Sequence, residues 1–260
     1  MKRLSIVLLV CGAAPALMFG QGGRGGRGGP PPVAVGRVGA PVDLTGYWVS
    51  IISEDWRWRM VTPLKGDAAS VPTTAAARMI IDAWDPAKDE AAGNQCKSYG
   101  AAAIMRVPGR VHITWDDDMT LKVEADAGQQ TRVFHFGGKA PAGAERTWQG
   151  YSVANWEAPP RNPGGSNLGT ARIGTGGKAL EVVTTNLKAG YLRKNGVPYS
   201  ENAVVNEYYD RHTEPNGDEW FTVTTVVTDP QYLTVPFVTS SDFKKEPDGS
   251  KWSPEPCKAR

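Results

Sequence analysis

The chain has 260 residues, a formal net charge of +2 and 40% hydrophobic residues. Its charges are scattered evenly along the sequence, which excludes a basic face for nucleic acid. Thirty glycines and twenty prolines indicate many turns and short strands, which favours a β-rich fold of one domain.

Residues 1–20 have the pattern of an export signal peptide. Lys2 and Arg3 precede an apolar stretch, and a polar, glycine-rich sequence follows. The apolar stretch is interrupted by Pro15 and is shorter than the roughly 20 residues of a membrane-spanning helix, so no membrane span is predicted. We expect an exported protein, periplasmic or secreted, cleaved near Gly20, with lipidation at Cys11 as the alternative.

Residues 21–41 are rich in glycine, proline and arginine and predict a flexible tether. A single folded domain is expected over 42–260, opening with a strand at 42–52. The alternating stretch WRWRM, residues 56–60, is interpreted as a continuation of this strand. The tryptophans would then lie on one face and the arginines on the other.

A short helical insert is predicted near residues 73–93. Two threonines at its start can accept hydrogen bonds from free backbone N–H groups, and apolar residues recur at helical spacing in MIIDAW. Pro86 ends the first helix and can begin a second, shorter one.

From residue 102 onward, stretches rich in β-branched and aromatic residues alternate with turn signals such as Asn195-Gly196. The first of these stretches is AAIMRV, residues 102–107, and all of them are interpreted as strands with antiparallel neighbours. Because closure removes exposed edges, we predict an all-β, mainly antiparallel fold: a lipocalin-like closed or nearly closed β-barrel of about 8–10 strands. One connection, residues 158–178, is long and is interpreted as a mobile loop.

Cleavage of the signal peptide would leave two cysteines, Cys96 and Cys257. In an exported chain such a pair predicts a disulfide, and a pair of free thiols is the alternative. Two distant cysteines without clustered histidines do not make a zinc site. The chain also lacks the glycine-rich fingerprints of nucleotide cofactors, so no metal and no cofactor are predicted.

The DLTGYW opening, residues 43–48, is similar to the Gly-x-Trp start of lipocalin-type barrels. Together with WDPAKDEAAGNQCKSYG, MRVPGRVHITWDDD and DPQYLTVPF, it resembles an uncharacterised family of exported bacterial proteins. The resemblance spans residues 43–257 and implies a barrel and a Cys96–Cys257 pair. It implies no chemistry, and the lipocalin analogy concerns the fold alone.

Aromatic residues close to arginines predict a cavity inside the barrel, walled by tryptophan rings, that binds a small, partly apolar molecule. An arginine in such a site could orient a carboxylate or phosphate group of the ligand. The alternative is a plain core of tryptophans with the arginines in solvent. The candidate ligand-binding residues are Trp48, Trp56, Arg57, Trp58, Arg59, Arg106, Trp115, Tyr151 and Trp156.

The first alternative function is a barrel enzyme that performs acid–base chemistry, of the isomerase, dehydratase or cyclase type. Its candidate catalytic residues are His112, His135, Glu207 and Tyr199, and at least two of them would have to converge at one cavity. A solvated outer face is the competing interpretation for Glu207. The second alternative is a structural or interaction protein of the cell envelope, with a solidly packed barrel.

Overall fold

The computed structural model describes residues 35–157 and 179–260. The predicted signal peptide, residues 21–34 of the predicted tether and the predicted mobile loop lie outside the described residues. The described end of the tether contacts the barrel, because the backbone N–H of Arg37 donates to the carbonyl of Asp118 at 2.8 Å. Within the described ranges, no helix is both long and apolar enough to cross a membrane.

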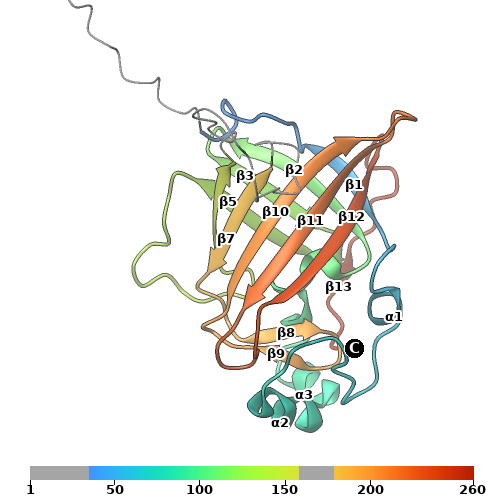
Figure 1. The fold of residues 1–260 in the computed structure, drawn as a ribbon, viewed down its shortest axis with the longest axis vertical. Helices are drawn as coiled ribbons and strands as arrows, with labels where there is room; N and C mark the ends of the chain where they lie inside the picture. The colour runs from blue at the N-terminus through green and yellow to red at the C-terminus, as the bar shows by residue number, and fades with distance from the viewer. Residues whose placement is uncertain (1–34, 158–178) are drawn as a thin grey trace, which may run out of the picture. The chain divides into compact units, whose positions relative to one another are not determined.

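Nine strands close into a β-barrel, which confirms the predicted fold class (Figure 1). Their order around the barrel is β1-β12-β11-β10-β7-β6-β5-β3-β2, and β1 pairs with both β2 and β12, so the sheet has no free edge. The strands of the barrel are β1 (Gly46–Ile51), β2 (Arg110–Asp117), β3 (Thr120–Ala125), β5 (Gln130–Phe136), β6 (Tyr151–Trp156), β7 (Leu180–Thr185), β10 (Val204–Thr213), β11 (Glu219–Thr228) and β12 (Phe237–Glu246).

One pair of neighbours, β5 and β6, runs parallel, so the prediction of antiparallel neighbours alone is wrong. The physical reason is the connection over residues 137–150. A parallel pair needs a connection of about a dozen residues or more, and this one is long enough for the chain to return to the end where β5 began.

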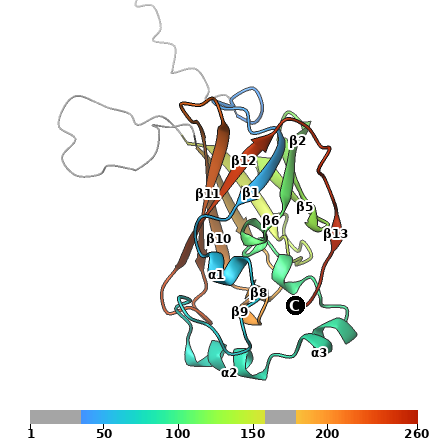
Figure 2. The same cartoon turned by 90° about the vertical axis from the view of Figure 1, so that its right-hand side faces the viewer.

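The helical insert forms where the sequence predicts it, as α2 (Ala75–Ala83) and α3 (Pro86–Ala91). The hydroxyl of Thr74 accepts a hydrogen bond from the N–H of Ala77 at 3.2 Å and so caps α2. Helix α2 packs against β9 (Val197–Tyr199), which forms a hairpin with β8 (Gly190–Arg193). Figures 1 and 2 show the helices and this hairpin at one end of the barrel, the hairpin end.

Two segments predicted as strands are helical turns instead. Residues 56–59 form α1 (Trp56–Arg59), because Asp55 has a φ of 50° and turns the chain after β1. Residues 104–106 form the 3-10 helix η2 (Ile104–Arg106), which follows η1 (Lys97–Tyr99). All three residues of η2 are buried, and consecutive burial is incompatible with the alternation of a half-buried strand. Each of these turns buries an arginine, Arg59 and Arg106.

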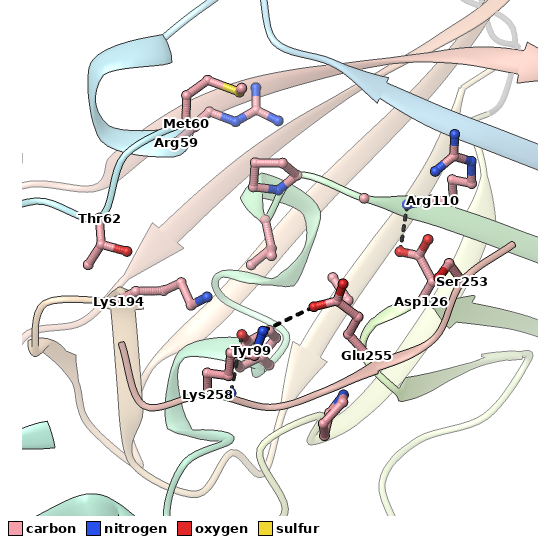
Figure 3. Close-up of a pocket in the computed structure, with 15 residues that line it drawn as sticks. Arg59, Met60, Thr62, Tyr99, Arg110, Asp126, Lys194, Ser253, Glu255 and Lys258 are labelled. Carbon is pink, nitrogen blue, oxygen red and sulfur yellow. Dashed lines mark hydrogen bonds and ion pairs between the residues drawn. The ribbon is translucent and has the colours of Figure 1, made fainter. Parts of the chain in front are cut away.

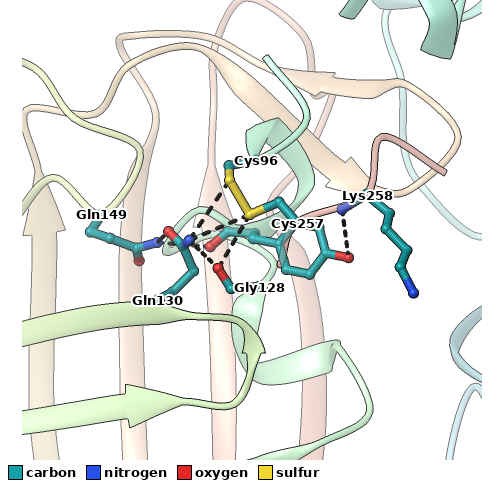
Figure 4. Close-up of a disulfide and its surroundings, with 7 residues drawn as sticks. Cys96, Gly128, Gln130, Gln149, Cys257 and Lys258 are labelled. Carbon is teal, nitrogen blue, oxygen red and sulfur yellow. Dashed lines mark hydrogen bonds between the residues drawn. A yellow bond between two sulfur atoms is a disulfide. The ribbon is translucent and has the colours of Figure 1, made fainter. Parts of the chain in front are cut away.

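The predicted disulfide joins Cys96 to Cys257 (Figure 4). It connects the segment after α3 to the C-terminal strap, residues 252–258. The strap contains the short strand β13 (Glu255–Pro256), which pairs in parallel with β4 (Ala127–Gly128). Beside the bridge, the side-chain amide of Gln130 donates to the carbonyl of Gly128 at 2.6 Å. The strap is therefore fixed by a backbone ladder and by a covalent bond.

Replacing Cys96 and Cys257 by serine is expected to lower the free energy of unfolding by about 4–5 kcal/mol, because the bridge closes a long loop and restricts the unfolded chain. The two cysteines are 161 positions apart. Urea unfolding of the wild type and the variant measures the difference, and reductant should not destabilise the variant further. Alkylation of Cys96 or Cys257 in native, unreduced protein would contradict the bridge.

Candidate functional site

The barrel interior is filled by aromatic side chains in contact with one another. Trp48 is fully buried, and its ring meets Phe221 edge to face at a centroid distance of 4.9 Å. Phe221 stacks on Phe243 at 4.7 Å and contacts Tyr209 at 5.9 Å. The indole N–H of Trp48 donates to the carbonyl of Leu44 at 3.0 Å. Trp48 therefore belongs to a packed core, and the prediction that it walls a ligand cavity inside the barrel is wrong.

The candidate ligand-binding residues on β2 and β6 pack against aromatic residues of β5. Trp115 and Trp156 both pack against Phe136, at centroid distances of 5.4 and 5.6 Å. Tyr151 stacks on His135 at 4.6 Å, and both are half-buried. The structure does not bring these residues together with the arginines of α1.

A buried ion pair crosses the interior from β5 to β10. Arg132 donates to both carboxylate oxygens of Glu207, at 2.8 and 2.5 Å, and both side chains are almost fully excluded from solvent. The hydroxyl of Tyr209 donates to Glu207 at 3.3 Å, and Arg132 also donates to Thr184 at 3.3 Å. The interpretation of Glu207 as part of a solvated outer face is therefore wrong.

Electrostatics keep two members of this network protonated. Burial is the largest single effect on the pKa of Arg132 and lowers it, but the charges and hydrogen bonds of Glu207 and Tyr209 together raise it by more, so the pKa stands above its ordinary value. Burial and the same carboxylate hold the pKa of the Tyr209 hydroxyl well above its usual range. Arg132 and Tyr209 both keep their protons at neutral pH. Glu207 is thus held by two donors, and the network stabilises the barrel.

The other acid–base candidates do not converge. His112 is half-buried, and its Nδ1 lies 3.4 Å from the carboxylate of Glu124. The strand register places Glu124 opposite His112 and Thr120 opposite His135, so the two histidines lie at different levels along β3. Tyr199 is fully buried at the hairpin end, where burial raises the pKa of its hydroxyl.

A cleft of about 400 Å³ lies at the hairpin end, where Figure 3 shows the side chains that line it. Its walls come from the segment after α1, the region from η1 to the start of β2, the tip of the β8–β9 hairpin and the C-terminal strap. This volume is within the range of small-molecule sites, about 300–1,000 Å³. The charged side chains that line the cleft are Arg59, Arg110, Lys194, Lys258, Asp126 and Glu255.

Positive side chains outnumber negative ones in the lining of the cleft, but all of them except Lys194 pair with a carboxylate. Lys258 pairs with Glu255 at 3.2 Å. In contrast, Lys194 has no carboxylate within ion-pair distance in the described part of the chain, and its ammonium group lies over the ring of Tyr99 at 4.9 Å. Lys194 is therefore the cation of the cleft with the greatest freedom to bind an anion.

Asp126 holds two walls of the cleft in place. Its carboxylate accepts a hydrogen bond from the backbone N–H of Arg110 at 2.7 Å, and its carbonyl accepts one from the N–H of Glu255 at 2.9 Å. Burial raises the pKa of this carboxyl, although the backbone hydrogen bonds partly offset the shift. Asp126 thus connects the start of β2 to the C-terminal strap.

Three buried arginines lie next to the cleft: Arg59 of α1, Arg106 of η2 and Arg193 of β8. They are only 7%, 6% and 4% exposed. Together they line a small space of about 30 Å³, the arginine pocket. The arginine pocket adjoins the cleft, because both spaces are lined by Arg59 and Lys194.

The acidic pair that precedes α1 compensates the first two arginines. Arg59 forms an ion pair with Glu54, and its Nε donates to the carbonyl of Arg106 at 2.9 Å. Arg106 donates to the carboxylate of Asp55 at 2.8 Å. The SEDWRWR stretch thus supplies both an arginine of the pocket and the carboxylates that allow two arginines to be buried there.

Arg193 is held by neutral groups. It donates to the carbonyl of Ala69 at 2.7 Å and to the hydroxyl of Ser70 at 3.4 Å, and its guanidinium lies over the ring of Trp58 at 4.9 Å. Within the described ranges, no carboxylate lies within ion-pair distance of it. Burial and the positive charge of Arg106 lower the pKa of Arg193 to about 10, so the side chain is still charged at neutral pH.

Of the candidate ligand-binding residues, the structure brings Trp58, Arg59 and Arg106 together around the arginine pocket. The other two candidates on α1 point away from it. Trp56 is 65% exposed, and the side chain of Arg57, 69% exposed, lies 3.9 Å from a carboxylate on the surface.

Arg193 and Lys194 line the arginine pocket but are not among the ligand-binding residues that the sequence predicts. The one available signal was their position directly before the Asn195-Gly196 turn, which places them at the tip of a hairpin. A turn signal does not show which way the side chains point, and this hairpin folds back against α2 and η1.

Within residues 35–157 and 179–260, no three His, Cys, Asp or Glu side chains are grouped so that they could hold a metal ion. Comparisons with protein-family models, curated proteins and solved structures found no match to this chain. The resemblance to exported bacterial proteins therefore stays a prediction, and the function rests on the site itself.

The variant Glu207→Gln is expected to lower the free energy of unfolding by about 3–5 kcal/mol, because it leaves the charge of Arg132 buried without a counter-charge. The double variant Arg132→Met with Glu207→Leu should recover most of this loss, since two apolar side chains carry no cost of desolvation. Urea denaturation of the wild type and both variants measures the effect. Equal stability of Glu207→Gln and the wild type would contradict a structural role for the pair.

Proposed function

We propose that this chain is an exported β-barrel protein that binds a small, partly apolar organic anion in the cleft at its hairpin end. The observation that carries the proposal is a cleft of about 400 Å³ that shares lining residues with a pocket of three buried arginines. Small-molecule sites combine apolar walls with a few polar groups that fix the orientation of the ligand.

The composition of the walls supports a ligand with two parts. Tyr99, Val107 and Pro108 supply apolar surface to the cleft, and an apolar group of the ligand would gain about 25 cal/mol for each Å² that it buries there. Lys194 supplies a positive charge that no carboxylate of the described residues compensates, and this charge attracts an anion and orients it.

The disulfide supports both the site and the export. Disulfides persist in oxidising compartments outside the cytosol, which agrees with the basic and apolar pattern of the first 20 residues. The bridge also fixes the C-terminal strap, and Ser253, Glu255 and Pro256 of the strap line the cleft. The geometry of the site thus depends on the oxidised state of the protein.

The charge reversal Lys194→Glu is expected to abolish or strongly weaken the binding of organic anions, because it places a negative charge in the cleft. Lys88→Glu is the matched control, since Lys88 is an exposed lysine on α3 that does not line the cleft. A thermal-shift panel of aromatic and aliphatic organic anions, each with a neutral analogue, measures binding. A ligand at 100 times its Kd should stabilise the protein by about 2.7 kcal/mol.

Two results would contradict the proposal. The first is a panel in which no compound stabilises the wild type, together with native mass spectrometry that finds no co-purified small molecule. The second is an anion whose thermal shift is the same in Lys194→Glu and in the control.

A further inference from the structure

We infer that the anchoring group of the ligand is a carboxylate, held in the arginine pocket by Arg59, Arg106 and Arg193. This inference rests on the proposed function and specifies the chemical class of the ligand. It is carried by three features of the pocket: hydrogen-bond donors that lack acceptors, positive charge that lacks a counter-charge, and the size of the space.

The three guanidinium groups retain donors with no acceptor. Nη2 of Arg59, Nη2 of Arg106 and Nε of Arg193 are buried and have no hydrogen-bond partner in the described part of the chain. A buried donor without an acceptor is costly, and most buried polar groups in proteins are paired. The three side chains that carry these donors line one small space, so an anion bound there would lie close to donors that lack acceptors.

The charges around the pocket leave a positive excess. Glu54 and Asp55 neutralise Arg59 and Arg106, whereas Arg193 has neutral hydrogen-bond partners only. Lys194, which follows Arg193 in the chain, also lines the pocket and also lacks a carboxylate partner in residues 35–157 and 179–260. A bound monoanion would reduce this excess in a site where the low dielectric makes its attraction strong.

Aromatic rings keep the guanidinium planes in place. The guanidinium carbons of Arg106 and Arg193 lie 5.5 and 6.0 Å from the ring centre of Phe237, and Arg193 also lies over Trp58. These cation–π contacts, together with the burial of the arginines away from water, hold the donors in one orientation before a ligand binds. The pocket is therefore preorganised, which reduces the entropy cost of binding.

The size of the space selects the kind of anion. Its volume is about 30 Å³. This is a small fraction of the volume of the cleft, so the space admits only a small group of the ligand. A planar carboxylate is smaller than a tetrahedral phosphate or phosphonate group and so fits this space better. The rest of the ligand would then extend into the adjoining cleft.

Three probes of matched shape test the inference: benzoate, phenylphosphonate and benzamide, with affinities measured by isothermal titration calorimetry on the full disulfide-bonded protein. We expect benzoate to bind at least about tenfold more tightly than either of the other two, because only benzoate combines the charge with the size of the pocket. Phenylphosphonate binding as tightly as benzoate would overturn the carboxylate assignment, and so would equal binding of benzamide.

The variant Arg193→Gln is expected to weaken benzoate binding at least about tenfold, because it removes a charged donor from the pocket. Arg37→Gln is the matched control, since Arg37 is exposed and does not line the pocket. As a measurement that needs no variant, the indole N–H signal of Trp58 in the NMR spectrum of the wild type should shift on titration with benzoate. Unchanged affinity in Arg193→Gln, or an unchanged Trp58 signal at saturation, would overturn the inference.

These outcomes separate the inference from the proposed function. If other anions of the panel bind in a way that depends on Lys194 but benzoate does not bind, the proposed function stands and the carboxylate anchor fails. If nothing in the panel binds and benzoate does not bind, both fail.

Discussion

Burying a guanidinium group costs free energy unless a carboxylate and other acceptors compensate its charge and its donors. Among the described residues, four arginines are buried: Arg59, Arg106, Arg132 and Arg193. Inside the barrel, Arg132 faces a carboxylate that accepts two of its hydrogen bonds, so the charge is compensated and the pair holds the interior together. At the hairpin end, three arginines share two carboxylates and keep unsatisfied donors. Arg59, Arg106 and Arg132 thus each have a counter-charge, whereas Arg193 has neutral hydrogen-bond partners only, so Arg193 is the buried arginine whose charge a bound anion would compensate.

The site is assembled from segments that are far apart in the sequence. The segment after β1 supplies Arg59, the 3-10 helix before β2 supplies Arg106, and the hairpin after β7 supplies Arg193. None of these segments belongs to the barrel itself. The barrel strands fix the two ends of each of these segments. The disulfide fixes the C-terminal strap, which lines the adjoining cleft. Many proteins carry their binding residues on loops that a rigid sheet positions. Here the sheet is a closed barrel, so it has no free edge at which it could open.

The sequence predicts the barrel well and the site only in part, for a physical reason. Strands such as β10, β11 and β12 alternate buried and half-buried residues over their length, and that period is visible in the sequence. The period does not show which face is inside, which is why Glu207 could be interpreted as a surface residue. It also failed at residues 56–59, where tryptophans and arginines alternate but Asp55 turns the chain into a helical turn. The aromatic and guanidinium side chains of Trp58, Arg59 and Arg106 predict a role in ligand binding from residue type alone. Arg193 becomes a pocket residue only through tertiary contacts, which no local sequence pattern encodes.

The packed interior explains why the proposed ligand site lies at the end of the barrel. A barrel of about eight strands has an interior that side chains can fill or that can hold one small ligand, but not both at the same level. Here the rings of Trp48, Phe221 and Phe243 contact one another, and the Arg132–Glu207 pair spans the space beside them. A ligand placed there would separate aromatic rings whose contacts stabilise the core. It would also separate the Arg132–Glu207 ion pair, and neither charged side chain can be buried without the other. At the hairpin end, in contrast, the donors already lack partners, so a carboxylate would satisfy groups that the fold leaves unsatisfied and would displace none that it needs.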